Sequence, residues 1–520
     1  MTLPVAPFDP IPLLLLAAPL ESDLLVFLEE AHRFVSAFPS LVALVEADLD
    51  AHGRGKKALR LADAAWREAH TAPLLPGATS EPAEIDPARL KLQQGRERTP
   101  AYVVLMALLL RGYFAAGFKA SQVATMMQES MTLLLFFTNL GLKMPGRSTL
   151  TELVNAVTHE TRQRILDAQA AHVLGMKLDD FSTMIQDSTH VEGNTAWPTD
   201  SRTMVALVAR ILHAGARLDR LRLPVLHSPR AQRHLDAMIQ LDREIDLNRG
   251  KGERARSRTR RYEKILWRAN RVRTLLAAAV AQIETALASL DVLPSKKAVA
   301  VRAVERLRAD VDALAKAILH CEARILAEVK VPMAEKILSV SDPDVGFIAK
   351  GQREPVIGYK PQIALSGESF IMALLLPQGH AADSGQLIPM VDDVVRRTRR
   401  VPRVLTVDDG YASQANVQAA KARGIEVVSI NGSKGRALTS RADWNSDEYA
   451  DARSLRSAAE SLIFTLKQGF AFGEVARRGL SAAHAELLEK ALAYNLCQVV
   501  RKREAAERKR DDEHALAPAA

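Results

Sequence analysis

The sequence predicts an α/β domain built on a mixed sheet flanked by helices, with an all-α region before it and a long helical segment inserted within it. Two observations predict this fold class. Short apolar runs rich in β-branched residues occur near position 185 and return after position 345, where amphipathic helical patterns alternate with them. Elsewhere, apolar residues recur at three- and four-residue spacing, the period of a helix with one buried face.

Composition narrows the class of protein. The 520-residue chain has a net charge of +9 and a pI near 9.5, which favours a polyanionic partner such as nucleic acid. Only Cys321 and Cys497 are present, too few for a disulfide framework or a cysteine-rich zinc site. No apolar run approaches the roughly 20 residues that span a bilayer. We therefore expect a soluble, cytoplasmic protein of two or three domains with no membrane partner.

The first part of the chain is predicted to be helical, from about Leu24 to His70 and from about Ala101 to Ala171. A stretch rich in Pro, Gly and charge separates the two blocks and predicts a linker. In the second block, KASQVATMMQES followed by MPGRSTLTELV is typical of two short helices, a turn and a third helix capped by Ser148 or Thr149. This pattern predicts either a helix-turn-helix that contacts DNA or a small bundle that only packs on its neighbour.

After about Ala171 the spacing of the apolar residues changes from the helical period. FSTMIQDSTHV predicts a strand, and PTDSRTMVALVARIL predicts a helix whose N-cap we assign to Asp200, with Thr199 and Ser201 beside it. From about His227 to Lys330 the pattern is helical and breaks at LDVLPSKK, which predicts two long helices in an antiparallel hairpin. The expected parts are an N-terminal helical region (1–75), a linker (76–100), a helical, candidate DNA-binding domain (101–172), the sheet domain in two pieces (173–226 and 336–475), the inserted hairpin (227–335) and a C-terminal helix with a basic tail (476–520).

Two aspartates stand at the ends of predicted strands. Asp187 follows TMIQ, and Asp408 follows RVLTV. If the two strands are neighbours, the carboxylates come close enough to share metal ions, and oxygen ligands suit Mg²⁺ or Mn²⁺. Read alone, an Asp at a strand end is more often a solvated terminus than a ligand.

A third acid occurs on a predicted helix, ARSLRSAAESLIFTLK. At 100° per residue, Arg453, Arg456, Glu460 and Lys467 share one edge of that helix, and an apolar arc beside it is expected to bury against the sheet. The edge is either an ordinary solvated face or part of a site.

Together these residues resemble the DDE transposases of bacterial insertion sequences, whose third carboxylate lies in a Tyr-x2-Arg-x3-Glu-x6-Lys signature. Arg456, Glu460 and Lys467 fit that spacing, whereas Arg453 occupies the Tyr position. IQDSTHVEGNTAWPTDS and VDDGYAS are similar to the first and second Asp motifs, and GYKPQIALS before LLPQGHAADSGQL is similar to the strand pair between them. The resemblance covers about Ala101 to Arg501 and is closest to the ISNCY group.

The resemblance implies a ribonuclease-H-like catalytic domain in which Asp187, Asp408 and Glu460 hold two Mg²⁺ or Mn²⁺ ions. The family motif places its second acid two positions before the Gly, here Gly410, which selects Asp408 over its neighbour Asp409. The implied reaction is hydrolysis of the phosphodiester at each end of a mobile element, followed by attack of the freed 3′-hydroxyl on target DNA.

The resemblance also implies partners. Arg456 and Lys467 would contact DNA phosphate, with Arg453 in the place of the family's Tyr. The expected partners are double-stranded DNA, as element ends and target, and further copies of the chain in a dimer or larger assembly, in the bacterial cytoplasm and on the nucleoid when DNA is bound. Two alternatives stay open: a transposase-derived DNA-binding protein without catalysis, and a metal-dependent nuclease of the same fold that does not join strands.

The most basic stretch runs from Arg249 to Arg273, with eleven Lys or Arg against two Glu. Each phosphate neutralised by such a stretch releases counterions, so we expect salt-sensitive DNA binding without sequence preference. The residues assigned to this contact are Arg256, Arg258, Arg260 and Arg261. The competing interpretation is an exposed helix face that binds nothing.

Overall fold

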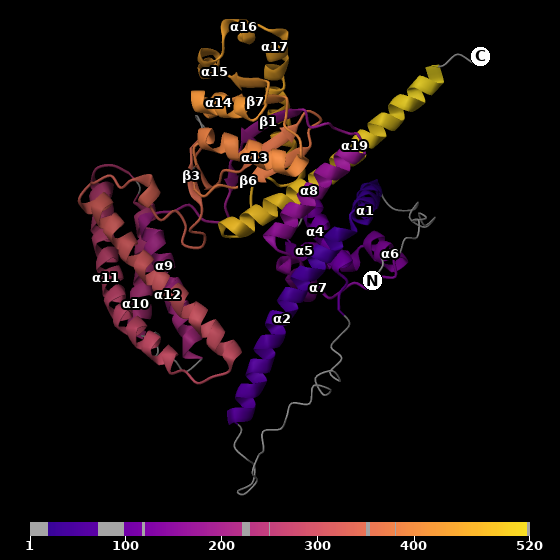
Figure 1. The fold of residues 1–520 in the computed structure, drawn as a ribbon. Coiled ribbons are helices and arrows are strands. Elements are labelled where there is room, and N and C mark those ends of the chain that lie inside the picture. Colours follow the sequence, from indigo (N-terminus) through magenta and orange to yellow (C-terminus); the bar gives the residue numbers. More distant parts are fainter. Residues whose placement is uncertain are drawn as a thin grey trace. The chain divides into compact units, whose positions relative to one another are not determined.

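A computed structural model of the chain describes residues 19–70, 98–116, 120–220, 229–248, 250–349, 354–379 and 381–516. They fall into two compact units (Figure 1). The sheet unit lies within residues 1–52, 93–194 and 344–520, and the helical unit lies within residues 53–92 and 195–343. Each unit has a hydrophobic core of its own.

The main sheet has five strands in the order β6-β5-β1-β7-β8. Its strands are β1 (Thr183–Ser188), β5 (Gln362–Ser366), β6 (Ile371–Leu375), β7 (Val404–Asp408) and β8 (Val427–Asn431). The pairs β1–β5 and β5–β6 are antiparallel, and β1–β7 and β7–β8 are parallel, so the sheet is mixed as expected. A second, three-stranded antiparallel sheet has the order β2-β4-β3, from β2 (Val191–Glu192), β3 (Gly346–Ile348) and β4 (Val356–Tyr359).

The two faces of the main sheet have different neighbours. Met184, Leu405 and Val407 point into the apolar core of the sheet unit, which α13 (Leu387–Thr398) helps to cover against β5 and β6 (Figure 1). Because side chains alternate along a strand, Thr406 points to the other face. There its Oγ1 donates to the carbonyl oxygen of Ala452, 2.7 Å away on α17 (Asp447–Ser454). Helices α17 and α18 (Arg456–Gly469) therefore pack on the opposite face from the main core.

The other helices of the sheet unit surround this framework. They are α1 (Pro19–Ala37), the first part of α2 (Pro39–His70), α4 (Ala101–Tyr113), α5 (Ala120–Glu129), α6 (Met131–Asn139), α7 (Arg147–Ala156), α8 (His159–Gly175), α14 (Gln414–Ala422), α15 (Ser433–Leu438), α16 (Arg441–Trp444) and α19 (Leu480–Leu516).

Helices α4 and α19 approach each other unusually closely. A Cβ added at Gly112 on α4 would lie 2.0 Å from the carbonyl oxygen of Glu489 on α19, so only glycine fits there. The buried Glu489 carboxylate accepts hydrogen bonds from Arg111, Arg162 and Arg477, which come from α4, α8 and the segment before α19. The Glu489 carboxylate, paired with three guanidiniums, therefore links α4, α8 and α19.

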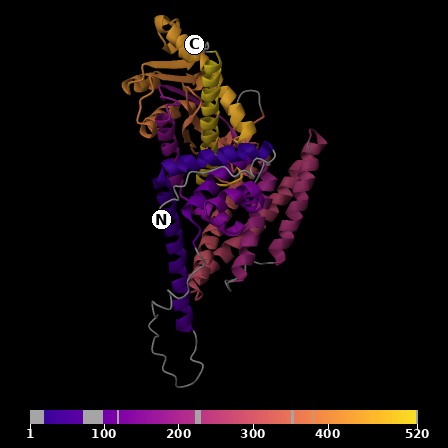
Figure 2. The same ribbon diagram turned by 90° about the vertical axis from the view of Figure 1, so that its right-hand side faces the viewer.

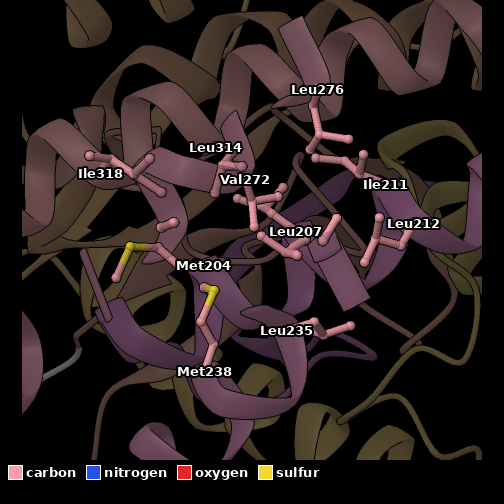
Figure 3. Packing of buried hydrophobic residues seen from close by; sticks show 14 of the residues in the cluster. Met204, Leu207, Ile211, Leu212, Leu235, Met238, Val272, Leu276, Leu314 and Ile318 are labelled. Carbon is pink, nitrogen blue, oxygen red and sulfur yellow. The ribbon is translucent and has the colours of Figure 1, made fainter. Parts of the chain in front are cut away.

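The helical unit contains α9 (Asp200–Asp219), α10 (Pro229–Leu247), α11 (Glu253–Ala288) and α12 (Pro294–Cys321), together with the second part of α2. Both views of the fold show α9 to α12 running alongside one another, and α9 packs on α10 and α12 (Figure 2). Their apolar stripes meet in one core, where Leu207, Ile211, Val272 and Leu314 interdigitate (Figure 3).

The helix-period regions of the sequence are confirmed as helices, but three local predictions were wrong. The segment expected to form a two-helix hairpin forms three helices, because Gly250 and Gly252 adopt positive φ between α10 and α11. The N-cap of α9 is Thr199, whose side chain accepts from the Arg202 N–H, while Asp200 pairs with Arg324 instead.

The cap expected at Ser148 or Thr149 is also absent. Helix α7 begins earlier, after Gly146, and has no side-chain cap.

The division into units differs from the expected boundary at residue 226 as well, because α9 packs on α12 and α10 and belongs with the helical unit. The expected linker lies mostly outside the described residues. Across the described ranges, none of the helices combines the length and apolar character needed to cross a bilayer.

Candidate active site

Asp187 and Asp408 lie on neighbouring parallel strands. The pairing of β1 with β7 places Ile185 opposite Thr406, and the same register continued by two residues puts Asp187 level with Asp408. Both side chains thus leave the sheet on the face that α18 covers, because α18 packs against β1 and β7. The condition set by the sequence analysis for a shared site, that these two strands are neighbours, is met.

Glu460 is delivered to the same place by α18. Ala459, Leu462 and Leu466 are buried and fix the helix on the sheet, as its apolar arc predicted. Glu460 projects from the edge of that arc, and its side chain is 71% exposed. The helix therefore holds the backbone of Glu460 while leaving its carboxylate free to turn.

The three carboxylates converge on one cationic nitrogen. Nη2 of Arg456 lies 3.0 Å from Oδ2 of Asp187, 3.6 Å from Oε1 of Glu460 and 4.0 Å from Oδ2 of Asp408. The side chain of Asp187 is only 5% exposed, so the nearby guanidinium offsets part of the cost of burying its charge. Nη1 of the same guanidinium is buried and has no hydrogen-bond partner among the described residues. Arg456 was expected to face DNA, and here it balances the acidic cluster.

Asp409 is engaged elsewhere. Its carboxylate accepts hydrogen bonds from the N–H groups of Lys434 (3.2 Å) and Gly435 (3.0 Å) and lies 3.4 Å from Oγ of Ser433, at the start of α15. Burial by itself would raise the pKa of Asp409, but these hydrogen bonds outweigh it and lower the pKa overall. Asp408 instead directs Oδ2 toward Arg456, while its Oδ1 accepts from the Gly410 N–H at 2.9 Å.

Arg453 does not share a helix with Glu460, so the predicted single helical edge was wrong at this residue. Arg453 belongs to α17, which ends before Leu455. At that junction the hydroxyls of Ser454 and Ser457 donate to the backbone carbonyls three residues earlier, which competes with the helical ladder. The Arg453 guanidinium stacks over the Trp444 ring, 4.3 Å from its centroid.

Lys467 keeps its expected position on α18, two turns beyond Glu460. Its Nζ lies 3.5 Å from Nε2 of His190, which follows β1. The signature Lys and the first-Asp motif are therefore in contact.

A buried polar network behind the carboxylates was not predicted. Nζ of Lys360 donates to Oδ2 of Asp383 at 2.8 Å, and Nε2 of Gln362 donates to Oδ1 of the same carboxylate at 2.9 Å. Tyr411 donates its hydroxyl to Oε1 of Gln362. Polar residues inside the strand-like run GYKPQIALS were the signal in the sequence, because Lys360 and Gln362 are buried there among apolar neighbours.

The network adjoins the acidic cluster. A Cβ added at Gly410 would lie 3.0 Å from Oδ1 of Asp408 and 3.2 Å from Oδ2 of Asp383, so these two carboxylates flank Gly410. Burial raises the pKa of Tyr411 well above its usual value, and the negative charges of Asp383, Asp187 and Asp408 raise it further. Tyr411 therefore remains a protonated donor beside the site.

The carboxylates fit a divalent metal by donor chemistry but not by their present spacing. Carboxylate oxygens are the ligands that Mg²⁺ and Mn²⁺ prefer, and three of them surround the Arg456 guanidinium. In the part of the chain that the structure describes, however, no three or more His, Cys, Asp or Glu side chains stand close enough to hold an ion. The oxygens are spread around a guanidinium, which is larger than a metal ion. A divalent ion would be held by these carboxylates only if Arg456 withdrew and the exposed Glu460 side chain turned inward.

A comparison with protein families matches residues 343–496 to the transposase DDE domain. This match supports a DDE transposase. No curated protein and no solved structure matches the chain. The matched span implies an enzyme that acts on DNA, and it includes Asp408, Arg456 and Glu460.

Asp187 lies outside the span matched by the DDE transposase domain. Its place in the site comes from the fold, because β1 is inserted between β5 and β7, which both lie inside the span. The first strand of the sheet is therefore separated in sequence from the rest of the domain by the helical unit.

Proposed function

We propose that this chain is a DDE transposase that cuts DNA at the ends of an insertion sequence and joins the freed 3′-hydroxyl ends to target DNA. The observation that supports the proposal most is the convergence of Asp187, Asp408 and Glu460 on Nη2 of Arg456. Three acids from distant parts of the sequence oppose one cation, and mutual repulsion disfavours such a cluster unless a cation is part of its role.

In the proposed site, Asp187, Asp408 and Glu460 hold Mg²⁺ or Mn²⁺, two ions by expectation. When bound, such ions stabilise the attacking and leaving oxygens of an in-line displacement at phosphorus. Arg456 moves from the carboxylates to a DNA phosphate, for which its buried Nη1 is an available donor. Lys467 holds a second phosphate from the same helix face, and Arg453 contacts the backbone from α17.

We also propose that the sheet unit is ribonuclease-H-like and closest to the ISNCY group. The strand order β6-β5-β1-β7-β8 supports this fold, with three antiparallel strands continued by two parallel ones. Acidic residues at the ends of the two central strands, β1 and β7, meet a third acid from a packed helix.

The proposed partners are double-stranded DNA and further copies of the chain, in a homodimer or larger assembly, in the bacterial cytoplasm. Helices α5 to α7 remain a candidate DNA-binding domain. On α11, Arg256 and Arg260 are exposed and remain candidates for backbone contacts, as does the partly exposed Arg258. Nε of Arg261 donates to Glu244 at 2.8 Å, so its contribution to DNA binding competes with that ion pair.

The test is cleavage and strand transfer on DNA carrying the ends of the element, with Asp187→Asn, Asp408→Asn and Glu460→Gln. Each variant is expected to lose about 1,000-fold or more of the cleavage rate, because a metal ligand is removed. Glu474→Gln, which changes an exposed carboxylate of the same unit, serves as the control and should cleave normally.

Several results would contradict the proposal or select an alternative. Normal cleavage by any of the three variants would exclude that residue from the metal site. Cleavage by the unsubstituted chain without joined products would indicate a nuclease, and DNA binding without cleavage in Mn²⁺ would indicate a transposase-derived binding protein.

A further inference from the structure

The helical unit exposes a large aromatic side chain among cations. Trp267 on α11 is 53% exposed, although tryptophan is highly buried in most folded proteins. The guanidinium carbons of Arg268 and Arg271 lie 5.8 and 5.6 Å from the centre of its ring, within cation–π distance. The indole is therefore held in place by charge from its own helix while a large part of its surface faces solvent.

Helix α10 adds charge to the same place. The His234 ring lies 5.7 Å from the Trp267 ring, and Nδ1 of His234 lies 3.5 Å from Nη1 of Arg268. Arg230 and Arg233 are exposed, and Arg230 stands one helical turn before His234 while Arg233 directly precedes it. Burial lowers the pKa of His234, and the positive charges of Arg268, Arg230, Arg233 and Arg271 lower it further.

The cationic surface also continues along α11. Arg260, Lys264, Trp267 and Arg271 are spaced by four, three and four residues, so they form one stripe on the helix. All four are exposed. At 1.5 Å per residue the stripe is about 16 Å long, which matches several nucleotides of an extended strand.

We propose that this surface, formed by Trp267 and the arginines of α10 and α11, binds single-stranded DNA, with an unpaired base stacked on the indole and the backbone along the cationic stripe. Positive charge selects a polyanion. The bases inside a duplex are stacked on one another and have no free face for an exposed indole. Unpaired bases do, and proteins usually bind single strands by stacking such bases on aromatic side chains. The choice of single-stranded DNA as the ligand rests on the proposed function, because strand cleavage frees DNA ends. The surface belongs to the helical unit, and the carboxylates belong to the sheet unit.

The test measures binding of a fluorescently labelled 30-nucleotide strand and of the matching duplex to the full chain in EDTA, by anisotropy at several salt concentrations. Trp267→Ala is expected to weaken single-strand binding about 5- to 150-fold, the range that alanine substitution gives for base stacking, and to change duplex binding much less. Trp267→Phe should retain most of the affinity. Arg268→Gln with Arg271→Gln should lower the slope of log affinity against log salt by about 1.4, since each single-strand phosphate contact contributes about 0.7.

The control is Arg302→Gln with Arg306→Gln, two exposed arginines on α12 of the same unit, which removes the same charge away from Trp267. The proposal is overturned if this control weakens binding as much as the α11 pair, or if Trp267→Ala leaves single-strand affinity unchanged. It is also overturned if polyglutamate competes as well as unlabelled DNA, because the occupant would then be an acidic polypeptide. Since no metal is present, each result is independent of whether the carboxylates catalyse cleavage.

Discussion

Asp408 and Asp409 are neighbours in sequence with separate tasks in the structure. Asp408 directs one oxygen toward Arg456, and Asp409 accepts hydrogen bonds at the start of α15. The fit around Asp409 is tight, because Gly432 has φ of +128° and a Cβ added there would lie 2.2 Å from the Asp409 carboxyl carbon. The alternation of side chains along a strand separates the two acids, so a one-residue shift would exchange their roles.

We predict that Asp408→Asn abolishes DNA cleavage with little change in stability, whereas Asp409→Asn lowers the free energy of unfolding by about 1 kcal/mol and leaves cleavage within about tenfold. The reason is that the first removes a proposed metal ligand and the second weakens a helix cap. Chemical denaturation and a cleavage assay on the same preparations measure both effects. The opposite pattern, with cleavage lost only in Asp409→Asn, would show that Asp409 and not Asp408 is the metal ligand.

At the scale of elements, Glu489 joins α4, α8 and α19 through Arg111, Arg162 and Arg477. Burial by itself would raise the pKa of Glu489, but the three guanidiniums lower it overall. A carboxylate whose pKa is lower in the folded state contributes stability above its ordinary pKa and loses it as the pH falls. The cluster therefore stabilises the sheet unit at neutral pH and weakens it in acid.

Glu489→Gln is expected to destabilise the chain by about 3–5 kcal/mol at pH 7, because three buried or half-buried guanidiniums lose their counterion. The matched control is Glu504→Gln, an exposed residue on the same helix, which should change stability by less than about 0.5 kcal/mol. The difference between the two variants should shrink progressively as the pH falls below about 4, because Glu489 is then protonated in the unfolded chain while the folded chain still holds it charged. Equal stability of both variants at pH 7 would show that the cluster has no net effect.

At the scale of the whole molecule, the two units have separate hydrophobic cores. Leu207 lies in the core of the helical unit and Leu405 in the core behind the sheet, and both are almost completely buried. Replacement of either by alanine removes buried methyl groups and leaves a cavity, at a cost of about 2–5 kcal/mol.

We predict that calorimetry of the full chain resolves two transitions, with Leu207→Ala lowering one and Leu405→Ala lowering the other. DNA cleavage at a temperature below both transitions should be retained in each variant, because neither residue touches the carboxylates. A single transition shifted equally by both substitutions would show that the cores unfold together.

The sequence by itself predicted most of the helices and strands and named the three acids that meet at Arg456, because helical and strand periods, a basic charge and the spacing of Arg456, Glu460 and Lys467 are local properties. It left open whether the strands ending at Asp187 and Asp408 are neighbours, which the pairing of β1 with β7 decided. Tertiary structure decided what depends on long-range packing: the guanidinium of Arg456 among the three carboxylates, the network of Lys360 and Asp383 behind them, and the grouping of α9 with the helical unit. Local pattern could not reveal these, since each depends on residues that lie far apart in the chain and are brought together only by packing.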